Sequence, residues 1–246
     1  MIDVHAHLTE FNDILEVIRR AKEAGLEHII ISIIDPSEIN RAKEIISLDP
    51  KFLHLTIGFD PTNLSEEEFS KFELLIEKES IVGIGEVGLD YYYIRDETQR
   101  SIQEKLFRRS IRLALKRNLP IIVHSRSAGR RALEILYSEG ADRVIMHAFD
   151  GKSGHANEAV KRGYYFSIPT SVVHSQQKQK LVRALPIESM VLETDSPVLS
   201  PIRGTRNEPA NLIYALKKVA EIKGISEEEV NRITTYNAKK IFNFFK

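Results

Sequence analysis

Two histidines separated by one residue, His5 and His7, are the first feature of this sequence that could support chemistry. Residues two apart on a β-strand point to the same face, so both imidazoles can converge on one metal ion. For an isolated pair near the start of a chain, chance would be the favoured explanation. The pair is not isolated, because metal-binding residue types also close other short apolar runs, at Glu86, His124, His147 and Asp195.

These side chains supply four imidazoles and two carboxylates. Burying them together without a cation would cost several kcal/mol per group unless they are paired, and two divalent ions would relieve that cost. The alternative, that each group hydrogen-bonds separately to a nearby loop, is a fair rival for any one residue but a weak one for the whole set. Two metal ions about 3.5–4 Å apart need a bridging ligand. Glu86 is the candidate bridge, and Asp195 is the candidate general base.

The ligand types also narrow the choice of metal. Imidazole with carboxylate suits zinc or manganese better than calcium, and a phosphate substrate would help magnesium to bind. The sequence contains no cysteine, so thiolate ligands and disulfides are excluded. The expected cofactor is therefore a pair of divalent ions, with zinc, manganese and magnesium as candidates.

The elements that must position these residues alternate between strand and helix along the whole chain. Amphipathic stretches such as Phe11–Ala24 and Glu97–Arg117 separate short β-branched runs, and Ser65 with Glu68 indicates a helix start. This alternation predicts a closed (β/α)8 TIM barrel in a single domain over residues 1–246, with an additional C-terminal helix from about Ser226. Barrel enzymes carry their sites at the C-terminal ends of the strands. The predicted strands are Ile2–His5, His28–Ile33, Phe52–Ile57, Ile81–Glu86, Ile121–His124, Arg143–His147, Tyr164–Ile168 and Met190–Asp195.

Composition limits the classes of protein that remain. Hydrophobic residues make up 42% of the 246 positions, enough for a full core. The 35 basic residues balance the 35 acidic ones, so no global field attracts nucleic acid or an anionic membrane. No apolar run approaches the ~20 residues that a membrane helix needs, and no signal segment is evident. We expect a cytoplasmic protein with no membrane contact and no obligate protein partner.

Several motifs, in order along the chain, resemble those of the TatD family of metal-dependent deoxyribonucleases in the amidohydrolase superfamily. The resemblance covers essentially the whole sequence. Taken together, the motifs are far more specific than His-x-His alone. They are Asp3–His7, Gly85–Tyr91, His124–Arg126, His147–Gly151, Glu193–Pro197 and Arg203–Pro209.

The resemblance implies that His5, His7 and Asp195 hold one metal, that His124 and His147 hold the other, and that Glu86 bridges them. The implied activity is phosphodiester hydrolysis that trims nucleotides from a DNA 3′ end, with RNA as a further candidate substrate. In that setting Arg126 and Arg206 are candidates to grip phosphate, against the alternative of ordinary surface contacts. Glu193 could fix the tautomer of a ligand imidazole, although an unrelated ion pair would explain it nearly as well.

The sequence also departs from the family pattern. Many relatives carry Gly-x-His-Pro-His after the third strand, whereas residues 58–62 here contain neither histidine and place Asp60 there. A bimetal enzyme acting on a small amide, lactone or phosphoester therefore remains the alternative, as does a metal-stabilised barrel without activity. The second alternative is disfavoured because structural metal sites leave no position open for water.

Overall fold

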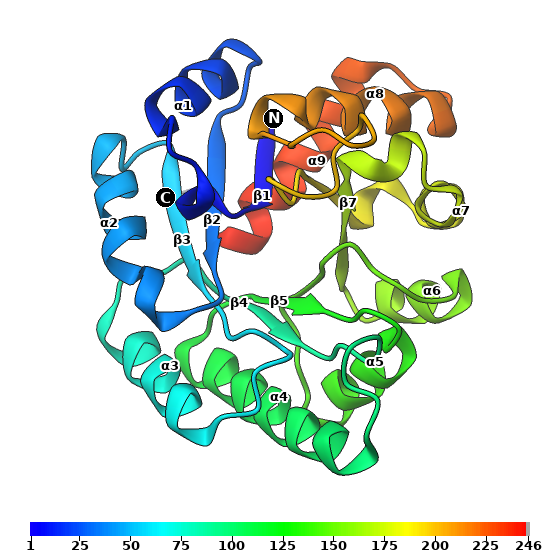
Figure 1. The fold of residues 1–246 in the computed structure, drawn as a ribbon. Coiled ribbons are helices and arrows are strands. Elements are labelled where there is room, and N and C mark those ends of the chain that lie inside the picture. The colour runs from blue at the N-terminus through cyan, green and yellow to red at the C-terminus, as the bar shows by residue number, and fades with distance from the viewer. Residues whose placement is uncertain (245–246) are drawn as a thin grey trace.

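Eight parallel strands pair in chain order around a barrel (Figure 1). The structure is a computed structural model that describes residues 1–244. The barrel closes just beyond the last strand, where the Asp195 amide donates to the His5 carbonyl at 2.9 Å and the His7 amide to the Ser196 carbonyl at 2.8 Å. The strands are β1 (Ile2–Ala6), β2 (His28–Ile33), β3 (Leu53–Ile57), β4 (Gly83–Gly88), β5 (Ile121–His124), β6 (Val144–Met146), β7 (Tyr165–Pro169) and β8 (Met190–Glu193).

Helices surround the strands and confirm the predicted TIM barrel with its additional C-terminal helix. Ser65, Asp96 and Ser226 each begin a helix by accepting a hydrogen bond from the backbone amide three residues on. No helix within residues 1–244 is long and apolar enough to cross a bilayer. The helices are α1 (Ile14–Glu23), α2 (Ile39–Leu48), α3 (Glu66–Lys78), α4 (Glu97–Arg117), α5 (Gly129–Ser138), α6 (Ser153–Lys161), α7 (Gln176–Ala184), α8 (Leu212–Lys223) and α9 (Glu227–Phe242).

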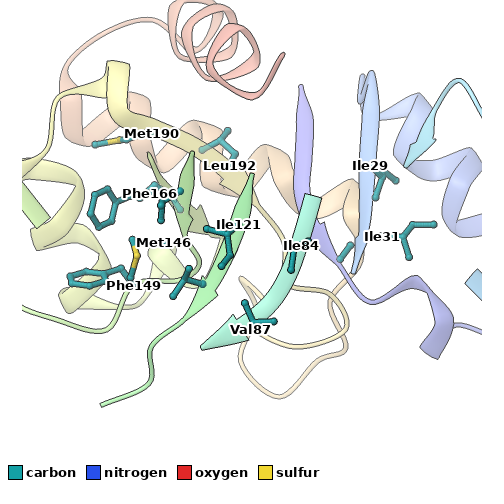
Figure 2. Close-up of a cluster of buried hydrophobic side chains, with 14 of the residues drawn as sticks. Ile29, Ile31, Ile84, Val87, Ile121, Met146, Phe149, Phe166, Met190 and Leu192 are labelled. Carbon is teal, nitrogen blue, oxygen red and sulfur yellow. The ribbon is translucent and has the colours of Figure 1, made fainter. Parts of the chain in front are cut away.

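Alternation along the strands divides the core into two layers. Residues such as Ile29, Ile31, Ile84 and Ile121 belong to the cluster between strands and helices, part of which is shown in Figure 2. Inside the barrel lies a second cluster. It comprises Ile2, Val4, Ile30, Ile122, Ile145 and Val191 from the strands and Ala238, Ile241 and Phe242 from α9.

Helix α9 closes the barrel at the end where the strands begin. The Asn237 side chain donates to the carbonyls of Ile187 and Met190, at 3.2 and 2.8 Å, at the start of β8. The Arg143 guanidinium donates to the Ile241 carbonyl at 2.5 Å. The additional helix is therefore the floor of the barrel, opposite the end that carries the predicted ligands.

The strand β4 occupies residues 83–88 rather than the predicted Ile81–Glu86, so Glu86 lies within the strand rather than at its end. The β4–β5 register shifts between Ile84 and Val87, and the β1–β2 register shifts between Asp3 and Ala6. A Cβ on Gly58 would lie 2.2 Å from the Glu86 carbonyl, so only glycine lets the chain after β3 pass this close to β4. Irregularities of this kind re-aim side chains, and both fall beside predicted metal ligands.

Candidate metal centre

The predicted ligands come from separate strands and meet at the C-terminal end of the barrel. His5 is in β1, Glu86 in β4, and His124 is the last residue of β5. His7 directly follows β1, His147 directly follows β6, and Asp195 lies two residues beyond β8. All of them except the fully buried His5 line one cavity of about 610 Å³.

One group of donor atoms combines His5, His7 and Asp195. The Nε2 atoms of His5 and His7 are 3.2 Å apart. The Oδ1 atom of Asp195 lies 3.6 Å from the first and 3.5 Å from the second. These three ligand atoms lie within 4.8 Å of one another, close enough to share a metal ion.

A second group is centred on Glu86, whose two oxygens face different imidazoles. Its Oε2 lies 3.3 Å from His5 Nε2, and its Oε1 lies 3.7 Å from His147 Nε2. The same Oε1 forms a hydrogen bond with His124 Nδ1. Glu86 thus lies between the two groups, where a bridging carboxylate would have to be.

The outer ring nitrogens show which face of each imidazole is free for a metal. His147 Nδ1 lies 2.8 Å from Glu193 Oε2, and His7 Nδ1 lies 3.1 Å from the Ser32 carbonyl. These oxygens hold a proton on Nδ1 of His147 and His7 and leave Nε2 directed at the cluster, where it can bind a metal once its own proton is lost. Glu193 therefore occupies the position required for the tautomer-fixing role expected from the sequence. His5 Nδ1 is buried and has no hydrogen-bond partner within residues 1–244.

Electrostatics tie the cluster together. Burial opposes the charged form of Glu86, but the imidazoles of His147 and His124 outweigh it and hold its pKa well below its usual range. Burial likewise opposes protonation of His147, but the charge of Glu193 and the other carboxylates raises its pKa to about 10. For His5, burial dominates and lowers the pKa. The negative carboxylates are therefore matched by the protonated imidazoles of His7, His124 and His147, and a divalent cation can replace those protons.

The donor set fits such a cation. Neutral imidazoles with ordered outer nitrogens, combined with carboxylates, are ligands for zinc and manganese. The described side chains provide two overlapping groups of this type, His5–His7–Asp195 and His5–Glu86–His147. His124 is in neither group: its Nδ1 contacts Glu86, and its Nε2 lies 3.0 Å from Asp90.

Metal binding should release protons. Interactions with Asp195 and Glu86 overcome burial and raise the pKa of His7 to about 9, and Glu86 with Asp90 does the same for His124. Below these values the imidazoles are protonated and compete with the metal. We expect Zn²⁺ or Mn²⁺ binding at neutral pH to release more than one proton, and to weaken as the pH is lowered. Calorimetry in buffers of different ionisation enthalpy measures this release, and identical heats in all buffers would contradict it.

The two arginines expected to contact phosphate lie in different places. Arg126 lines the cavity, with its guanidinium 4.0 Å from the ring centre of Tyr92 and 5.0 Å from that of Tyr93. Arg206 donates to the Glu10 carbonyl at 2.6 Å and is not among the residues that line the cavity. The structure brings Arg126 to the ligands and gives no such support to Arg206.

Two residues of the cavity were given no role by the sequence analysis. Asp90 lies 3.0 Å from His124 Nε2 and accepts hydrogen bonds from the amides of Tyr92 and Tyr93. Its position four residues after Glu86 is the feature of the sequence that could have predicted its place in the cavity. Lys178, in α7, donates to the Ala148 and Phe149 carbonyls at 2.5 and 2.9 Å. Burial lowers its pKa to about 8, and no local pattern links this lysine to the cavity.

Comparisons with known proteins identify similar sequences and a similar fold. The family model described as TatD related DNase matches residues 2–243. The putative deoxyribonuclease TATDN3 of Mus musculus is 40% identical over 258 residues, which cover 98% of this chain and 88% of the mouse protein. The uncharacterized metal-dependent hydrolase YabD of Bacillus subtilis is 38% identical and covers 98% of both chains. The crystal structure of the TatD homolog YJJV from Escherichia coli shares the fold, with a TM-score of 0.89, 24% identity, and coverage of 99% of this chain and 98% of that one.

Proposed function

Because this chain belongs to the TatD family of metal-dependent deoxyribonucleases, we propose that its cavity hydrolyses phosphodiester bonds of DNA and removes nucleotides from the 3′ end. The observation that carries the proposal is the position of Glu86, whose two oxygens face different imidazoles within one cavity. A carboxylate whose two oxygens face different ligand groups suits two metal ions better than one.

In this proposal His5, His7 and Asp195 would hold one divalent ion, His124 and His147 would hold the other, and Glu86 would be shared. Such ions lower the pKa of water and neutralise charge on a phosphate. Glu193 and Ser32 keep the ligand imidazoles oriented through their Nδ1 atoms.

Asp195 is the proposed general base. It orients the attacking water and accepts its proton on a carboxylate oxygen as the water oxygen bonds to phosphorus. The P–O3′ bond breaks, the O3′ oxygen takes a proton from solvent and leaves as the 3′ hydroxyl of the shortened strand, and the released nucleotide keeps the phosphate. The Asp195 carboxylate is ionised and free to accept a proton, because its pKa is lowered: burial opposes ionisation, but the positive His147 outweighs it.

Arg126 is the proposed phosphate contact. It forms no ion pair with a carboxylate of the described residues, and its guanidinium rests on tyrosine rings at the cavity wall. We expect Arg126→Met to raise KM for an oligonucleotide about 10-fold, the loss of a charge-assisted hydrogen bond. Steady-state kinetics compare it with Arg206→Met, whose side chain lies on the Glu10 carbonyl. An equal rise of KM in the two variants would contradict a specific role for Arg126 in phosphate binding.

The proposed activity is tested with single-stranded oligonucleotides labelled at the 5′ end. A ladder of shortened labelled products is expected, which disappears in excess chelator and returns when Zn²⁺, Mn²⁺ or Mg²⁺ is added. Full cleavage in chelator would refute the metal mechanism. Release of the labelled nucleotide alone would reverse the proposed polarity.

One observation favours the second candidate, hydrolysis of a small amide, lactone or phosphoester. The cavity wall carries Asp60 where many relatives carry histidines, and a carboxylate there repels a polyanion. A panel of dihydropyrimidine and lactone substrates, assayed beside the oligonucleotides, separates the two. Turnover on that panel with no oligonucleotide cleavage would select the second candidate.

A further inference from the structure

The cavity continues along the surface as a chain of hollows. The next hollow, of about 560 Å³, shares Asp150 with the cavity. It in turn shares Gly151, Lys152 and His155 with a third hollow of about 560 Å³. The second and third hollows lie along α5, α6 and α7, which follow one another around one side of the barrel (Figure 1). We call these two hollows together the α5–α7 trough.

The trough carries an excess of positive charge. Its carboxylates are Glu134 and Asp150, against four cationic side chains, of which Arg131 pairs with Glu104 at 2.6 Å. Arg130 pairs with Glu134 at 2.8 Å, and the Asp150 carboxylate accepts the Ser127 amide at 2.8 Å. The cations are Arg130, Arg131, Lys152 and Lys180.

Lys152 and Lys180 are the two members without an acidic partner among residues 1–244. A comparable cationic hollow lies along α4, but there the charges are neutralised. Arg109 in that hollow pairs with Glu66 and Glu73 at 2.5 and 2.7 Å. Since the chain as a whole has a net charge of zero, a polyanion must be held by a local excess of this kind.

The backbone around the trough adds to this preference. Helices α5 and α6 both begin with no side-chain cap and with no acidic residue in the first turn. Their free N–H groups suit phosphate oxygens. The Gln177 side chain donates to the Phe149 and Gly151 carbonyls at 3.1 and 3.4 Å, which holds the segment between cavity and trough in place.

We propose that the α5–α7 trough binds the sugar–phosphate backbone of single-stranded DNA on the 5′ side of the scissile bond. The inference rests on the proposed function. A cavity of about 610 Å³ has the size of a small-molecule pocket, so the terminal nucleotide enters it unpaired. The strand that follows must leave over the rim, and the trough offers a way out past Asp150 toward Lys152 and Lys180, the cations with no acidic partner among the described residues.

The test is the double charge reversal Lys152→Glu/Lys180→Glu, with Lys51→Glu/Lys217→Glu as the matched control. All four lysines are exposed or nearly so, and the control pair lies before β3 and on α8, outside the trough. Metal-loaded proteins are assayed on a dinucleotide and on a single-stranded dodecamer over a range of salt concentrations. Thermal melting checks that all variants fold.

The trough variant is expected to lose about 10-fold in kcat/KM on the dodecamer, and to retain wild-type activity on the dinucleotide. Its salt dependence should become shallower by about one to two in the log–log slope, since each single-strand phosphate contact contributes about 0.7. The control should match wild type. Unchanged dodecamer cleavage, or an equal loss on both substrates, would overturn the proposal.

Equilibrium binding of a fluorescent dodecamer separates this inference from the nuclease proposal. If the wild type binds the dodecamer through these lysines but cleaves no oligonucleotide, the trough stands and the nuclease proposal falls. If the wild type cleaves and the charge reversal leaves binding unchanged, the trough alone is refuted.

Discussion

Asp195→Asn is expected to lower kcat on an oligonucleotide by about 10³- to 10⁴-fold while the protein remains folded. The amide cannot take a proton from the attacking water, and it offers the imidazoles of His5 and His7 no negative charge. The fold should persist because Asp195 has a φ of 55°, a left-handed conformation that asparagine adopts as readily as aspartate.

Asp60→Asn is the matched control, since it makes the same chemical change elsewhere on the cavity wall. It should retain activity within about 10-fold of wild type, with Asp195→Asn well below it. Rates at saturating metal, together with thermal melting of each variant, measure this. Near-normal turnover by Asp195→Asn would remove Asp195 as the base.

Glu86→Gln is expected to lower the bound metal from about two ions per chain to about one, and to lower kcat by at least about 100-fold. The reason is geometric: Oε2 faces His5 and His7, at 3.3 and 3.8 Å, whereas Oε1 faces His124 and His147. A neutral amide supplies one oxygen and one N–H₂ group, so it cannot serve both sides.

Metal content after gel filtration is measured by mass spectrometry beside activity. Glu104→Gln provides the control, because Glu104 pairs with Arg131 at 2.6 Å outside the cavity. That variant should keep its metal and its rate. Full metal content in Glu86→Gln would exclude Glu86 as a bridge.

The barrel could be predicted because its signals are local. Strand and helix periodicities alternate along the chain, and α4 has the predicted bounds Glu97–Arg117. The convergence of His5 and His7 followed from their spacing, and their Nε2 atoms lie 3.2 Å apart. The prediction for α1 began too early, at Phe11, because Leu8–Glu10 forms a separate 3-10 turn before the helix starts at Ile14.

Parts of the site depend on contacts between segments that a single sequence does not display. The predicted fourth strand began and ended two residues before the observed β4. The Gly-Ile-Gly-Glu-Val-Gly sequence of β4 has weak strand propensity, so the sequence did not mark its bounds. Its position depends on close packing, since a Cβ on Gly88 would lie 2.1 Å from the His124 carbonyl. Lys178 reaches the cavity only because α7 packs beside the Ala148–Phe149 backbone. Close contacts of this kind, between segments distant in the sequence, exist only once the barrel has closed.

The barrel is closed by hydrogen bonds between β1 and the segment after β8, and this closure has a consequence for how the protein is made. His5 and His7 emerge during translation before the other seven strands, whereas Asp195, which completes their group, emerges after all eight. A nascent chain therefore contains His5 and His7 long before Asp195 can join them. An intermediate still bound to the ribosome would offer a metal ion only part of this ligand group. Contacts of such long sequence separation form late. The group formed by His5, His7 and Asp195 is thus complete only after β1 and the segment that follows β8 have joined.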